Sequence, residues 1–121
     1  MTAAEDLRFR AFDPPHLGIP AGARFSGKAS GGEGRFVELF LHVERGTVLD
    51  AGFLTDIPGG EGVLCASFWC EAATGADIEK ARSLTEADLL ACFPPGFPPP
   101  LEAARLCVEA GRMALEKTRD Q

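Results

Sequence analysis

The stretch RFVELFLHVE at residues 35–44 decides the fold. Every second residue is aliphatic, and these four residues share one side of an extended chain (Val37, Leu39, Leu41 and Val43). The intervening positions carry aromatic and polar residues (Phe36, Glu38, Phe40 and His42). A period of two predicts a β-strand with a buried aliphatic face and a second face of mixed character.

The flanking residues place this strand in a small antiparallel sheet. The sequence ERGT at residues 44–47 predicts a tight turn, with Gly46 supplying positive φ. Residues 48–54 then return as the partner strand, with Leu49, Ala51 and Phe53 expected on one side. Upstream, residues 24–27 predict a short edge strand, and the four glycines within residues 27–34 predict a flexible surface loop.

Helical patterns dominate the rest of the chain. Residues 63–74 are apolar nearly all round, which is typical of a buried helix. A further helix begins after Thr85, and a proline-rich elbow at residues 93–100 precedes a last helix at residues 101–117. That last helix is expected to bury a wide face made of two adjacent stripes (Leu101, Ala104, Val108 and Leu115; Ala103, Leu106, Ala110 and Met113). Residues 3–12 fit a helix or a short strand. Strands segregated from helices predict an α+β fold, with the helices on one face of a meander of two or three strands.

Length and charge limit the classes of function. A chain of 121 residues suits one domain over residues 1–121, with residues 1–7 and 117–121 expected to fray. The net charge is −6 and no dense Lys/Arg cluster exists, which argues against nucleic acid and against an anionic membrane surface as partners. The amino-terminal residues are acidic and lack an apolar run. We therefore expect a cytoplasmic protein whose cysteines stay reduced.

Five short motifs together resemble the IscU/NifU amino-terminal type of iron–sulfur cluster assembly scaffold. They follow the family's order along nearly the whole chain: DPPHLG at 13–18, GEGR at 32–35, DAGF at 50–53, PGG at 58–60 and LTEADL at 84–89. The resemblance implies the IscU/NifU-like arrangement of an antiparallel sheet with helices on one face. It also implies a role in iron–sulfur cluster assembly.

The family's ligand positions are all substituted in this chain. The places of its three cysteines hold Glu33, Gly59 and Ala104, the place of its aspartate holds Arg35, and the place of its histidine holds Ala103. Iron–sulfur clusters require thiolate ligands. The sequence therefore predicts a degenerate scaffold with no cofactor and no enzymatic activity, acting through partners such as a cysteine desulfurase.

Two alternatives remain open at this tip. The first is an ion-pair cluster of Glu33, Arg35 and Glu102 where the metal would have been. The second is an altered site for a divalent metal or a cluster, using Glu33, Glu102, Asp56 and a cysteine. A different class of function is a small-molecule or protein-binding module that reuses the fold without metal.

The cysteines and histidines predict little chemistry. Cys65 and Cys70 lie five apart, so on a helix they point about 140° away from each other. We expect all four cysteines, which include Cys92 and Cys107, to be buried core thiols. His42 is expected at the surface, on the sheet's second face, and His16 in the proline-containing loop, so the sequence does not favour a cysteine–histidine enzyme.

The second face of the sheet also carries Phe36 and Phe40. These rings are either an exposed partner surface or are covered by the amino-terminal segment or by the loop at residues 16–23. The proline-rich elbow corresponds to the segment where the resembled family binds a chaperone, but the family's lysine is missing there. As an alternative, the prolines only set the angle of the last helix.

Overall fold

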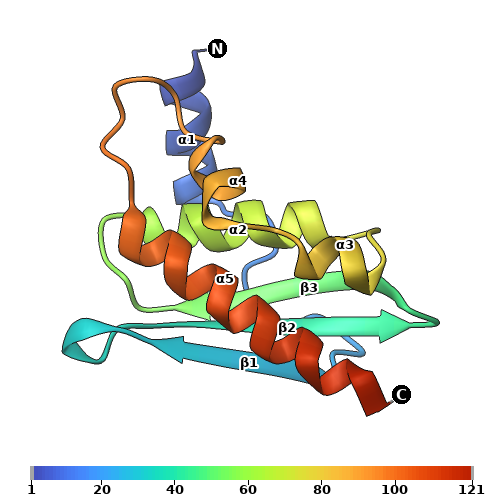
Figure 1. Ribbon diagram of the computed structural model, residues 1–121. Coiled ribbons are helices and arrows are strands. Elements are labelled where there is room, and N and C mark those ends of the chain that lie inside the picture. The colour runs from blue at the N-terminus through green and yellow to red at the C-terminus, as the bar shows by residue number, and fades with distance from the viewer. Residues whose placement is uncertain (1, 121) are drawn as a thin grey trace.

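The computed structural model describes residues 2–120 and has an antiparallel three-stranded sheet in the order β1-β2-β3, with helices on one face (Figure 1). The elements in chain order are α1 (Ala3–Phe12), β1 (Phe25–Ser30), the 3₁₀ turn η1 (Gly32–Gly34), β2 (Phe36–Glu44), β3 (Thr47–Thr55), α2 (Glu61–Ala73), α3 (Ile78–Arg82), α4 (Glu86–Leu90), α5 (Leu101–Glu116) and the 3₁₀ turn η2 (Lys117–Asp120). This confirms the predicted α+β class and the meander topology.

The core lies between the sheet and the helices α2 and α5, which cross its inner face (Figure 1). All four aliphatic residues of β2 are at most 1% exposed, as their alternation predicts. Helix α5 crosses closely over β1, because a Cβ at Gly27 would overlap the backbone of Ala110. The absence of a side chain at Gly27 therefore sets the distance between this helix and the edge of the sheet.

Strand β1 is longer than the sequence predicts. The glycines predict a loop from residue 27, but the strand continues to Ser30, with Ala29 paired to Val37 and Ser30 to Phe36. Ala29 is 4% exposed and belongs to the core. The composition of residues 27–30 does not favour a strand, but pairing with β2 and packing under α5 stabilise the extended conformation there. The turn itself is confined to residues 31–35.

A bulge in β3 overturns the predicted position of Leu49. The register shifts between His42 and Val43, so that His42 faces Asp50 while Val43 faces Val48. Leu49 is the additional residue and is 45% exposed instead of buried. Val48 takes its place in the core, because the extra residue changes which side chains face inward on that part of the strand.

The outer face of the sheet is partly covered by residues 16–24. This segment first runs along the edge of β3, where Gly18 N–H donates to Phe53 O (2.8 Å) and Phe53 N–H donates to His16 O (3.1 Å). It then passes over His42, whose ring would lie 3.0 Å from a Cβ at Gly22. Phe36 and Phe40 are half-buried, so this face carries no fully exposed aromatic patch.

The helices begin where the sequence has capping residues. Thr2 and Glu5 form a capping box on α1, which makes residues 3–12 a helix and not a strand. Thr85 and Asp88 form the predicted capping box on α4. Although residues 3–7 and 117–120 are helical, fraying of the two ends in solution stays a prediction.

Two residues assigned to the buried face of the last helix lie outside it. Leu101 is 60% exposed in the first turn of α5, and Met113 is 46% exposed near its end, whereas the other predicted members of the two stripes are buried. Within residues 2–120, none of the helices has the length and apolar character that crossing a membrane requires.

Candidate functional site

Three segments meet at one end of the sheet, which we call the tip (Figure 1). They are the turn at residues 31–35, the loop at residues 56–60 and the first turn of α5. Phe36 N–H donates to Asp56 Oδ1 (2.8 Å), which joins the start of β2 to the end of β3. A Cβ at Gly31 would lie 3.2 Å from Glu102 Cδ, so α5 begins directly over the turn. The structure therefore brings together Glu33, Arg35, Asp56 and Glu102, as the resemblance implies.

The charged residues of the tip pair with each other only in part. Arg35 Nη2 lies 3.1 Å from Glu33 Oε2, and these side chains are 40% and 79% exposed. Glu102 makes no ion pair with Arg35 within the part of the chain that the structure describes. The predicted ion-pair cluster is therefore wrong for Glu102, whose side chain lies against Gly31 instead of pairing with Arg35. An exposed pair of this kind contributes at most about 1 kcal/mol.

The other predicted ligand positions carry no donor that suits a cluster. Ala103 and Ala104 are 1% and 0% exposed, so their methyl groups belong to the core. Gly59 has φ +77 and no side chain. The Asp56 carboxylate already accepts a hydrogen bond from the backbone. Within the described residues, no group of three or more His, Cys, Asp or Glu side chains is placed to hold a metal ion. The donor set at the tip does not fit the thiolate-bound cluster of the resembled family.

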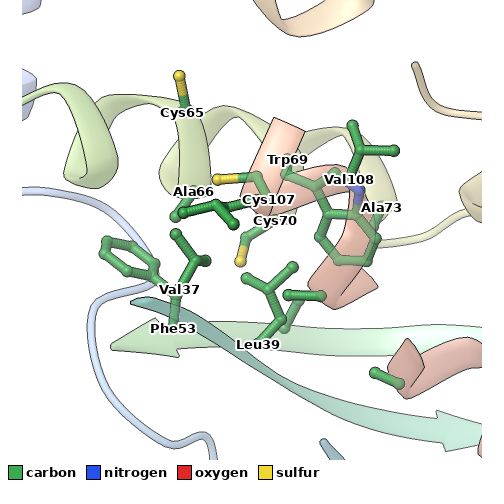
Figure 2. Close-up of a cluster of buried hydrophobic side chains, with 14 of the residues drawn as sticks. Val37, Leu39, Phe53, Cys65, Ala66, Trp69, Cys70, Ala73, Cys107 and Val108 are labelled. Atoms are coloured by element: carbon green, nitrogen blue, oxygen red, sulfur yellow. The ribbon is translucent and has the colours of Figure 1, made fainter. Parts of the chain in front are cut away.

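Three of the thiols are core residues with little reactivity. Cys65, Cys70 and Cys107 are 0% exposed and belong to the core; in Figure 2 the sulfur of Cys70 points toward the sheet, whereas that of Cys65 points away from it. Burial, assisted by the nearby Glu61 carboxylate, raises the pKa of Cys65 to about 12. Burial also raises the pKa of Cys70 and of Cys107. Because the thiolate is the nucleophile and the metal ligand, a raised pKa leaves these groups in the less reactive thiol form at neutral pH.

The directions of the thiols agree with the helical spacing. Figure 2 shows the sulfur atoms of Cys65 and Cys70 on opposite sides of α2, as the five-residue spacing predicts. The fourth thiol corrects the prediction, because Cys92 follows the short helix α4 and is exposed. Its Sγ lies 3.5 Å from Asp88 O. Partial burial, followed by the charge of Glu71, raises the pKa of Cys92, while Arg10 acts in the opposite direction.

The histidines have structural partners. His16 lies in the left-handed region (φ +72), and its Nδ1 is 2.9 Å from Ala51 O and 4.0 Å from Asp50 Oδ1. His42 Nε2 is 3.3 Å from Glu44 Oε1. Both rings lie at the edge or outer face of the sheet, whereas the buried thiols lie on its inner side. The described residues therefore contain no Cys–His pair for nucleophilic catalysis, and the absence of enzymatic activity stays a prediction.

Sequence reasoning missed the residue that attaches α1 to the body. Arg10 Nη1 donates to Glu71 Oε2 (2.7 Å) and to the buried Ser67 Oγ (3.1 Å). Its guanidinium carbon also lies 4.6 Å from the centre of the Phe68 ring. These partners are about 60 residues away in the sequence, and no local pattern identifies them.

In comparisons with known proteins, this chain matches solved structures by its fold and not by its sequence. No family model matches the chain, and no curated protein matches its sequence. A crystal structure described as a hypothetical protein has a TM-score of 0.72 at 17% identity, covering 94% of this chain and 96% of its own. A nitrogen-fixing NifU-like protein (amino-terminal) from Brucella abortus has a TM-score of 0.66 at 14% identity, covering 99% of each chain.

A third structure extends the same likeness. An iron–sulfur cluster assembly scaffold protein assigned to the SUF system of Fervidobacterium islandicum AW-1 has a TM-score of 0.61 at 12% identity, covering 93% of each chain. At these identities the likeness defines the class of fold, which is that of the NifU/SufU-type scaffolds. The resemblance read from the sequence is thus confirmed for the architecture.

Proposed function

We propose that this protein keeps the frame of an iron–sulfur assembly scaffold, does not itself hold a cluster, and acts by binding protein partners. The observation that carries the proposal is the chemistry of the tip. Where a scaffold needs three converging thiolates, this chain has an exposed Glu33–Arg35 pair, a glycine at position 59 and the buried methyl group of Ala104. A cationic guanidinium at the same place also disfavours a bound cation.

Anaerobic reconstitution with ferrous iron and sulfide tests the first part. An established iron–sulfur scaffold treated in parallel is the control that the assay works. We expect visible absorbance of a cluster from the control and none from this protein after desalting. Stoichiometric iron and sulfide retained by the folded protein would contradict the proposal. If iron is retained without sulfide, Glu33→Ala and Glu102→Ala variants would show whether the tip carboxylates bind it.

The second part concerns the partner, for which the scaffold fold favours a cysteine desulfurase. We expect the purified protein to retain a desulfurase from the same host in a pull-down assay. Arg35→Glu reverses a charge at the tip, and Lys80→Glu makes the same change on α3 at the opposite end of the sheet (Figure 1). Binding through the tip predicts that Arg35→Glu weakens capture and that Lys80→Glu does not. Equal capture by both variants would exclude the tip as the interface.

Absence of capture by the folded wild-type protein would favour the alternative class, a binding module that reuses the fold outside iron–sulfur assembly. Metal analysis of protein purified from its own host complements both assays. Iron or zinc at one equivalent per chain would contradict the proposal that the tip holds no metal.

A further inference from the structure

Helix α1 carries two aromatic side chains that the body of the protein does not cover. Phe9 is 63% exposed and Phe12 is 90% exposed. The helix stands away from the sheet (Figure 1) and is held from its other side, where Leu7 is buried and Arg10 binds Glu71. Two phenyl rings on one short helix form an apolar surface that residues 2–120 leave largely uncovered.

Charges of opposite sign border this surface on its two sides. A hollow of about 430 Å³ on one side of Phe9 is lined by Glu5, Arg8 and Phe12. A second hollow of about 250 Å³ on the other side of Phe9 is lined by Asp6, Arg10, Asp13 and Pro15. Because Arg10 is bound to Glu71, the second side is acidic, whereas the first side presents the cation of Arg8.

The spacing of these residues matches a seam between two parallel helices. Phe9 and Phe12 are three apart and take the a and d positions of a heptad, which places Arg8 at g and Asp13 at the following e. Asp13 is the C-cap residue and has non-helical φ −133, but its N–H donates to Phe9 O (2.9 Å) and it lines the second hollow together with Asp6, which keeps it on the e side of the helix. In a parallel pair a g residue meets the e residue five positions later in the other helix, so Arg8 of each copy faces Asp13 of the other.

We infer that α1 is a self-association surface, and that its occupant is a second copy of this chain. The two α1 helices pack in parallel about a two-fold axis, with the rings of Phe9 and Phe12 between them and two Arg8–Asp13 pairs at the border. An antiparallel pair would instead bring the acidic side of one helix against the acidic side of the other. The charge pattern is therefore complementary to itself in one orientation only, as an isologous interface requires.

The exposed area predicts that this association is weak. The two rings of one copy offer roughly 300 Å² of apolar surface, since a phenylalanine buries about 200 Å² when fully covered. Two copies together bury less than the roughly 1,200 Å² of a stable interface, which places the dimer among transient complexes. Glu5, at the preceding d position, faces Glu5 of the other copy in a parallel pair. The repulsion between the two carboxylates weakens the dimer further.

Analytical ultracentrifugation of the full chain, from about 10 µM to about 0.5 mM, tests the inference. We expect a monomer–dimer equilibrium within this range. Phe12→Ala should raise the dissociation constant at least about tenfold, because the ring is a central contact. Leu49→Ala removes a 45% exposed side chain on β3 and is the matched control, with no expected change.

Charge exchange distinguishes the proposed orientation from nonspecific hydrophobic association. Arg8→Asp and Asp13→Arg should each weaken the dimer, whereas the double variant should restore it, because the pair is then re-formed with reversed signs. Glu5→Gln should strengthen it. A monomer throughout the concentration range, or single and double variants of equal affinity, would overturn the inference. Neither result bears on the tip, so the proposed function is tested independently.

Discussion

The indole ring of Trp69 lies directly against the backbone of Gly111, where α2 crosses α5. A Cβ at position 111 would overlap the ring and would also lie 2.9 Å from its Nε1. Both residues are buried, and Trp69 is the largest fully buried side chain in the core. The approach of the two helices therefore depends on a position without a side chain.

We predict that Gly111→Ala destabilises the protein, although alanine is favoured in an isolated helix by about 1 kcal/mol. Overpacking a core costs roughly 1–3 kcal/mol, and a Cβ that would overlap Trp69 Cζ2 puts this site in the upper part of that range, about 2–3 kcal/mol. After the gain in helix propensity, we expect a net loss of about 1–2 kcal/mol in the free energy of unfolding. Urea denaturation followed by circular dichroism measures it. The same substitution in a Trp69→Phe background should cost less, because the smaller ring makes room for the methyl group. A Gly111→Ala variant as stable as the wild type would refute the packing argument.

Arg10→Ala should release α1 from α2. The guanidinium binds Glu71 and Ser67 and lies over Phe68, with a side chain that is 17% exposed. Because Glu71 is exposed, we expect a loss of only about 1 kcal/mol. Amide hydrogen exchange should accelerate in α1 before it does in the sheet. Arg8→Ala, compared at low protein concentration, is the control for removing a cation from the same helix. Equal exchange in the two variants would mean that Arg10 does not anchor the helix.

Only one of the four thiols should react in the native state. Cys92 is exposed, whereas Cys65, Cys70 and Cys107 are buried. We expect a thiol-specific reagent to modify one equivalent per folded chain and all four after denaturation. A Cys92→Ser variant should lose the native-state reaction entirely. Rapid modification of a second thiol would show that the core around α2 and α5 opens easily.

Stability should fall at alkaline pH because of the buried thiols. Their folded-state pKa lies above the ordinary value of 9.0, and that of Cys65 is about 12. Between these pH values the unfolded chain has lost a proton that the folded chain keeps, so unfolding is favoured as pH rises. Each thiol contributes up to about 1.4 kcal/mol per pH unit in this window, and nothing below it.

Thermal or urea denaturation between pH 8 and about pH 10.5 measures this slope. Cys107→Ala should be less stable than the wild type at neutral pH, since it loses core volume, but its stability should fall less steeply with rising pH. An unchanged slope in the variant would argue that Cys107 titrates equally in the folded and unfolded states.

Several features of the fold were accessible from local sequence. The alternation in residues 36–44 identified the central strand and its buried face, and the turn at Arg45 and Gly46 identified the hairpin. Capping residues at Thr85 and Asp88 located the start of α4. These signals arise from interactions between residues that are close together in the sequence, so the sequence alone is enough to recognise them.

The sequence predicted the location of the candidate site but not the pairing of its side chains. The order of the motifs predicted that Glu33, Arg35 and Glu102 would meet near one end of the sheet, and they do. Their pairing was not predictable, because Glu102 turns toward Gly31 while Arg35 binds its neighbour in the turn. Side-chain partners are chosen by geometry at the scale of a few ångströms, which motif spacing does not specify.

The sequence by itself determined the segregation of strands from helices, the inner face of the central strand and the lack of sulfur ligands at the family's positions. Tertiary structure alone decided that β1 runs on through its glycines to Ser30, that a bulge turns Leu49 outward and that Cys92 lies at the surface. The physical reason is the separation along the chain between the residues that interact. Periodicity and capping act between neighbours along the chain, whereas register, burial and the attachment of α1 through Arg10 depend on residues that only folding brings into contact.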